Sequence, residues 1–74
     1  MAKLLNENPK ILRRRQVEER TGLSRSTIYL RIQVGTFPKP VNLGARAVGW
    51  LENEIDAWLK SRIEYRDNGQ EAQS

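Results

Sequence analysis

The strongest constraint on the fold is residues 15–32, RQVEERTGLSRSTIYLRI, which have the pattern of two short helices joined by a tight turn. Gln16 to Thr21 are mostly good helix formers around one apolar residue, Val17. Gly22 then suits a left-handed C-terminal cap. Because Ser24 is a typical N-cap residue, a second helix is expected after a break of only three residues. This spacing is typical of a helix-turn-helix.

The second helix has two contrasting faces. Ile28 and Ile32 lie four residues apart, so we expect them to face the core and pack against Val17 and Leu23. The other face and the N-terminal end carry side chains that suit base edges and phosphates. The residues expected to contact DNA here are Arg25, Ser26, Thr27 and Tyr29. The alternative to DNA binding is an ordinary amphipathic helix pair whose polar face is solvated.

Length and composition exclude several classes of protein. The 74 residues suffice for one small domain, and the chain has no cysteine and no histidine. Disulfides, thiol nucleophiles, the usual zinc sites and the commonest general base are therefore absent, and we expect neither an enzyme nor a cofactor. No apolar run approaches the roughly 20 residues of a membrane span, and no signal peptide is evident. We expect a cytoplasmic protein.

Charge is distributed unevenly along the chain. The net charge is +4, but residues 10–46 hold nine basic and two acidic residues, a net +7. Residues 51–74 hold three basic and six acidic residues, a net −3. A concentrated basic surface favours binding to the phosphate backbone through counterion release. An adaptor that binds only protein, for instance through Tyr29 and Leu30, would not need this concentration of charge.

A run of three arginines, residues 13–15, falls at the start of the first helix, where free amide groups and the helix dipole favour anions. We expect Arg14 and Arg15 to contact phosphates. The alternative is that these side chains are solvated and paired with Glu18 and Glu19 at helical spacing.

After Gly35 the pattern changes to a short β-hairpin. Pro38 and Pro40 exclude a helix, and Phe37 between them and Gly35 is expected to anchor this crossing to the core. In residues 41–43 and 47–50 apolar side chains alternate with others, as in two half-buried strands joined by a turn at 44–46. Near the start of the chain, Ile11 and Leu12 are expected to be either extended or in a turn before the first helix. The hairpin would form a wing, with Arg46 near its tip and Lys39 at its base contacting the DNA backbone. A hairpin that only packs against a helix is the alternative.

The last helix is expected over residues 50–66. Its apolar residues form a stripe at helical spacing: Leu51, Ile55, Trp58, Leu59 and Ile63. Trp50 and Trp58 are both interpreted as core residues rather than stacking platforms. The domain would then comprise residues 10–66, with a flexible arm at 1–9 and a flexible tail at 67–74.

Three segments in order, GLSRSTIY (22–29), GTFPKPVNLG (35–44) and RAVGWLENEIDAWL (46–59), resemble the AlpA family of prophage regulatory proteins. The resemblance implies a mainly α fold with a small β-hairpin, a winged helix-turn-helix like the DNA-binding domains of MerR-type proteins and phage excisionases. The recognition helix would be residues 25–31, which adds Arg31 to the expected contacts, and the wing 39–46. Leu30 departs from the family pattern, and either a thymine methyl or a partner subunit would explain its outward position.

The resemblance further implies sequence-specific binding to double-stranded DNA of a prophage or integrated element, controlling integrase expression and excision. An excisionase acting at attachment sites is the alternative. The protein partner would be integrase or RNA polymerase, depending on which of these roles the protein has. Because one short helix reads few base pairs, we expect a monomer or weakly self-associating protein that binds DNA in several copies.

Overall fold

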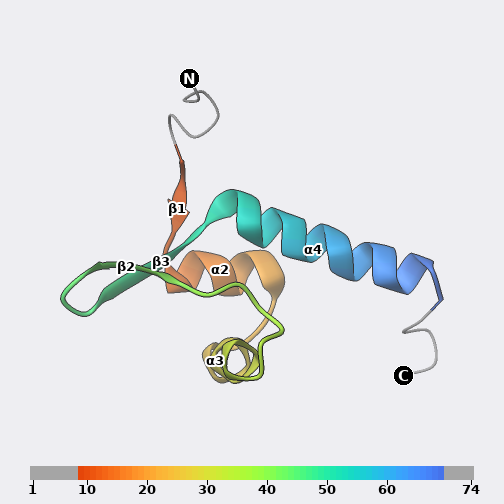
Figure 1. Cartoon of the computed structure of the whole chain (residues 1–74), viewed down its shortest axis with the longest axis horizontal. Helices are drawn as coiled ribbons and strands as arrows, with labels where there is room; N and C mark the ends of the chain where they lie inside the picture. Colours follow the sequence, from red (N-terminus) through yellow and green to blue (C-terminus); the bar gives the residue numbers. More distant parts are fainter. Residues whose placement is uncertain (1–8, 70–74) are drawn as a thin grey trace.

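The computed structural model describes residues 9–69, which form three helices and three short strands (Figure 1). The prediction of a mainly helical fold with a small β-structure is confirmed. The expected arm at 1–9, apart from Pro9, and the expected tail beyond residue 69 lie outside the described residues. The elements in chain order are β1 (Ile11–Leu12), α2 (Arg14–Thr21), α3 (Arg25–Gln33), β2 (Val41–Gly44), β3 (Ala47–Leu51) and α4 (Glu52–Asp67).

Helices α2 and α3 form the predicted helix-turn-helix. Gly22 adopts a left-handed conformation with φ 74°, and its N–H donates to the Glu18 carbonyl at 2.8 Å. The Ser24 hydroxyl oxygen then accepts from the Thr27 N–H at 3.2 Å and caps α3. Helix α2 begins at Arg14, inside the arginine run that was expected at its start, and the Gln16 side chain accepts from the backbone N–H of Arg13 at 2.8 Å. Gly22 and Ser24 therefore have the capping roles that the sequence predicted for the turn of the helix-turn-helix.

The strands form one antiparallel sheet in the order β1-β3-β2. Residues 11–12 are extended and pair with 50–51, so the wing hairpin gains a third strand that ties it to the start of the domain. Gly49 lies where the strands approach closely, since a Cβ there would be 3.0 Å from the Leu12 carbonyl oxygen and would collide with the Ile11 side chain. The absence of a side chain at 49 allows this close pairing.

The hydrophobic core lies where the sheet meets the helices. Trp50 is fully buried, whereas Trp58 is partly buried and packs against the core. Both indoles hold the crossing between α3 and β2: Trp50 Nε1 donates to the Pro38 carbonyl at 3.0 Å and Trp58 Nε1 to the Thr36 carbonyl at 2.8 Å. The buried residues are Leu12, Val17, Ile28, Phe37, Trp50 and Ile55.

Strand β2 and the end of α4 are more exposed than predicted. Val41 and Leu43 were expected to be half-buried, but all of β2 is exposed, because the β2–β3 hairpin projects from the body of the domain (Figure 1). Ile63, the last residue of the apolar stripe, is 50% exposed because α4 extends past the other elements. Helix α4 also begins at Glu52, since Leu51 is the last residue of β3. No helix in the described part of the chain is long and apolar enough to cross a membrane.

Candidate nucleic-acid interface

An arginine-lined depression of about 370 Å³ lies between the start of α2, the start of α3 and the β2–β3 turn. Its arginines come from three segments that are well separated in the sequence, and the helix-turn-helix and the wing bring them together. Lining side chains are Arg13, Arg14, Arg15, Arg25, Arg46 and Val48. Four of these arginines, all but Arg13, were among the predicted DNA contacts.

The five arginines of this depression are balanced by few acidic groups. Arg14 pairs with Glu18 at 2.7 Å, as the solvated alternative had anticipated for this position, and Arg13 Nε donates to the Val48 carbonyl at 3.1 Å. Within residues 9–69, no ion pair joins Arg15, Arg25 or Arg46 to a carboxylate. Several positive charges held close together without counter-charges make this depression suited to an anion.

Arg46 occupies the two-residue turn of the wing, close to the predicted tip. Its φ is 63°, a left-handed backbone conformation that is unfavourable for residues other than glycine. A bulge between Asn42 and Gly44 precedes this turn, and the Asn42 side chain accepts from the Gly44 N–H at 2.9 Å. A bulge increases the local twist of a hairpin and re-aims nearby side chains. The wing thus carries Arg46 into the arginine-lined depression despite a local cost in backbone energy.

The N-terminal half of α3 borders the same depression through Arg25. Ser26 is exposed, and Thr27 Oγ1 accepts from the Ser24 hydroxyl at 3.0 Å, which leaves the proton of Thr27 free to donate. Tyr29 is 38% exposed, and its ring meets that of Trp50 edge-on with a centroid distance of 6.3 Å. The helix N-terminus adds its own preference for anions.

Five predicted contact residues do not line the depression: Ser26, Thr27 and Tyr29 follow Arg25 along α3, and Arg31 and Lys39 lie elsewhere. The guanidinium carbon of Arg31 is 5.9 Å from the centroid of the Trp58 ring, and Arg31 Nε is buried without a hydrogen-bond partner within the described residues. Lys39 borders a different surface groove. DNA contact by Arg31 and Lys39 therefore stays a prediction. It requires that the DNA-binding surface of the protein extend beyond the depression.

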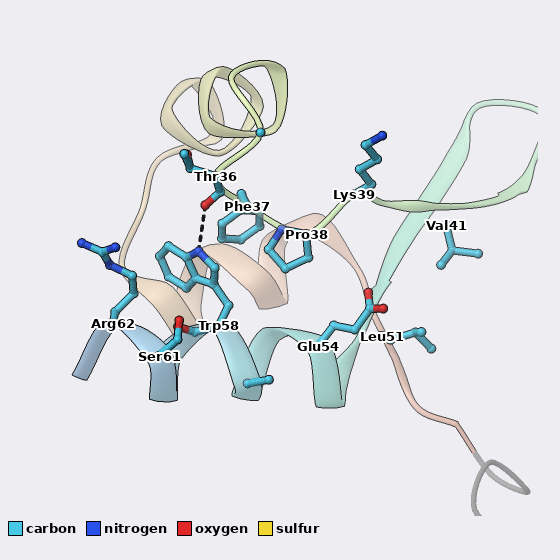
Figure 2. A pocket seen from close by; sticks show the side chains of 12 residues that line it. Thr36, Phe37, Pro38, Lys39, Val41, Leu51, Glu54, Trp58, Ser61 and Arg62 are labelled. Carbon is cyan, nitrogen blue, oxygen red and sulfur yellow. Dashed lines mark hydrogen bonds between the residues drawn. The ribbon is translucent and has the colours of Figure 1, made fainter. Parts of the chain in front are cut away.

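The second groove, about 880 Å³ in volume, runs between residues 35–41 and α4 (Figure 2). In Figure 2 the Trp58 indole lies beside Phe37 and donates to Thr36, and the rings of Trp58 and Phe37 meet edge-on with centroids 4.8 Å apart. Glu54 and Arg62 also line it, so the groove has mixed charge. This groove was not predictable from the sequence, because it depends on how residues 36–40 lie over α4.

Sequence reasoning missed Arg13 and Val48 as lining residues of the arginine-lined depression. Arg13 belongs to the same arginine run as Arg14 and Arg15, so that run was the available signal. Val48 had no such signal, because only the pairing of β3 with its neighbours places it there.

Comparison with known proteins identifies the family. The family described as Prophage CP4-57 regulatory protein (AlpA) matches residues 10–63. An uncharacterized protein, ORF88, of Enterobacteria phage P4 is 46% identical over 63 residues, covering 85% of this chain and 72% of the relative. The DNA-binding transcriptional activator AlpA of Escherichia coli strain K12 is 44% identical over 59 residues, covering 72% of this chain and 84% of the relative. The chain belongs to the AlpA family of prophage regulatory proteins.

Proposed function

We propose that this protein binds double-stranded DNA through the arginine-lined depression and the adjoining face of α3, and does so without catalysis. The observation that carries the proposal is the convergence of arginines from three separate segments in one depression. Of these, Arg15, Arg25 and Arg46 form no ion pair with a carboxylate in the described range. A duplex offers a regular array of phosphates to such a surface.

In this proposal the residues divide between two kinds of contact. Arg14, Arg15 and Arg46 bind phosphates from α2 and the wing and fix the position of the protein on the duplex, because phosphate contacts carry no sequence information. Arg25, Ser26 and Thr27 enter the major groove from the first turn of α3, with Tyr29 beside them. Arg31 and Lys39 extend the backbone contacts on the far sides of α3 and the wing.

We further propose that the protein regulates transcription in a prophage or integrated element, where it controls integrase expression and excision. The printed name of the Escherichia coli relative, a DNA-binding transcriptional activator, supports the regulatory role. The family description, a prophage regulatory protein, supports the genetic setting. Several copies on adjacent sites, or a partner such as integrase or RNA polymerase, would supply the specificity that one short helix lacks.

Salt dependence of binding tests the role of the depression. We would measure affinity for a duplex by fluorescence anisotropy over a series of salt concentrations, for the wild type, Arg46→Ala and Arg66→Ala. Arg66→Ala is the matched control, because it removes the same charge from the far end of α4. Each lost phosphate contact should lower the slope of log K against log salt by about 0.9. Arg46→Ala should show this decrease and Arg66→Ala should not; equal slopes for both variants would overturn the assignment.

Footprinting tests the regulatory role. The purified protein would be incubated with DNA spanning its own gene, the nearest integrase gene and the ends of the element, with random competitor DNA present. Protection at a promoter supports the transcriptional regulator. Repeated protected sites confined to the vicinity of an attachment site would replace it with an excisionase, and no protection by folded protein would refute DNA regulation.

A further inference from the structure

The outward face of α3 carries exposed aliphatic side chains where a DNA-binding helix would be expected to carry polar ones. Leu30 is 59% exposed and Val34, the C-cap residue, is 62% exposed. Successive residues of a helix are rotated by about 100°, so Leu30 points almost directly away from the buried side marked by Ile28 and Ile32. Ser26 lies one turn before Leu30 on the same stripe, and Val34 one turn after it.

This stripe is uncharged. Arg25 and Arg31 are the charged residues of α3, and both lie off it: Arg25 borders the arginine-lined depression, and Arg31 lies over Trp58. The stripe Ser26, Leu30 and Val34 therefore offers one small hydroxyl and two aliphatic surfaces, next to a strongly basic depression. Helix α4 meets α3 at Trp58, beside Arg31, whereas Leu30 and Val34 stay exposed.

In the proposed function the first turn of α3 enters the major groove, and the stripe continues along α3 from Ser26 in that turn. The one apolar group that the major groove presents is the C5-methyl of thymine, and it distinguishes T·A from the other base pairs. We propose that Leu30 is a specificity-determining residue that packs on thymine methyl groups, with Val34 extending the same contact. This inference rests on the proposed function, since it requires α3 to lie in the major groove.

Thymine-to-uracil substitution tests the proposal, because it removes only the methyl group. Duplexes would first be selected from a random pool by the wild-type protein, and each thymine would then be replaced singly by deoxyuridine. We expect about fourfold weaker binding at one or two positions, the effect of one buried methyl. The same replacement should not change DNA binding by the Leu30→Ala variant, which lacks the side chain that contacts the methyl group. The matched control is Ile63→Ala, which truncates a half-exposed aliphatic residue on α4. The replacement should weaken DNA binding by this control as much as it weakens binding by the wild type.

The alternative results are separable. If duplexes are selected but no uracil replacement matters, or if Leu30→Ala shows the same losses as the wild type, the methyl contact is refuted while DNA binding stands. A third result is that Leu30→Ala still binds more weakly to the uracil-containing duplexes, as the wild type does, but no longer binds DNA in several copies. That result would also refute the methyl contact, and it would indicate that Leu30 lies in an interface between protein copies. If no duplex is enriched by folded wild-type protein, the proposed function fails together with this inference.

Discussion

Two arginines on neighbouring elements, Arg20 near the end of α2 and Arg25 at the start of α3, have opposite surroundings. Arg20 joins α2 to α4, with its guanidinium nitrogens 2.7 Å from a Glu52 carboxylate oxygen and 3.2 Å from one of Asp56. The hydrogen bond with Glu52 raises the pKa of Arg20 and, through the same contact, lowers the pKa of Glu52. Arg25 instead borders a depression lined by four further arginines.

The difference shows that the residue type does not decide the role of an arginine; the charges around it do. The acidic residues of the chain are concentrated after residue 51, and α4 presents some of them to Arg20. The depression lies away from α4, so most of its arginines keep their charge available for a ligand. One side of the molecule therefore uses ionic contacts to hold the fold, and the other side concentrates charge for binding.

The strongest test of this division is a substitution in the supporting framework. Trp50→Ala should cost about 3–5 kcal/mol, because it empties the largest buried site and removes the hydrogen bond to Pro38. So small a domain should then be largely unfolded. Thermal unfolding followed by circular dichroism would measure this loss. Arg15→Ala should keep the wild-type melting temperature, and a similar loss of stability in both variants would contradict the division.

Local sequence rules predicted the helix-turn-helix well, because its determinants are local. Gly22 and Ser24 each act on their nearest neighbours, and Ile28 faces inward as the period requires. The exposure of Val41 and Leu43 was not predictable from alternation alone. Alternation indicates that a strand has two faces, but not whether another element covers one of them.

The candidate site was also predictable only in part. The basic excess pointed to Arg14, Arg15, Arg25 and Arg46, and all four line the depression. Composition could not separate them from Arg31, whose position over Trp58 depends on how α4 packs against the crossing segment. Likewise, nothing in the sequence distinguished Arg20 from the arginines of the depression until α4 was placed beside it.

Within the binding side, Arg25 and Arg46 should behave differently. Arg25→Ala is expected to weaken binding to the selected duplex by about 1–3 kcal/mol if Arg25 contacts a guanine edge, with a smaller loss on random DNA. Arg46→Ala should weaken binding to both duplexes nearly equally. Anisotropy titrations on the two duplexes would compare them, and an equal loss on both for Arg25→Ala would exclude base recognition by Arg25.

Arg46 also allows stability and binding to be separated at one position. Glycine tolerates a φ of 63° without strain, so Arg46→Gly should raise the free energy of unfolding over that of Arg46→Ala by about 1 kcal/mol. Both variants should lose the same DNA affinity, because both lose the guanidinium. Urea unfolding and anisotropy would measure the two quantities. Recovery of affinity in Arg46→Gly would show that the backbone of the turn, and not the charge, supports binding.

The smallest expected effect concerns the ion pairs of Arg20. Because the folded pKa of Glu52 lies below its ordinary value of 4.5, its contribution to stability is complete above that pH and is lost as the pH falls through the folded pKa. Wild type should therefore be more stable than Glu52→Gln near neutral pH, and the difference should shrink on acidification below pH 4.5. Urea unfolding at several pH values would test this. A difference that does not change with pH would mean that the pair contributes through packing alone.

Amide shifts of 15N-labelled protein, mapped during titration with the selected duplex, would show directly where DNA binds. If the duplex occupies the arginine-lined depression, the largest changes fall at the start of α2, along the first two turns of α3 and in the wing turn, with little change in the second half of α4. Largest changes along α4 and residues 35–41 would contradict it, because the ligand would then occupy the groove of mixed charge and not the arginine-lined depression.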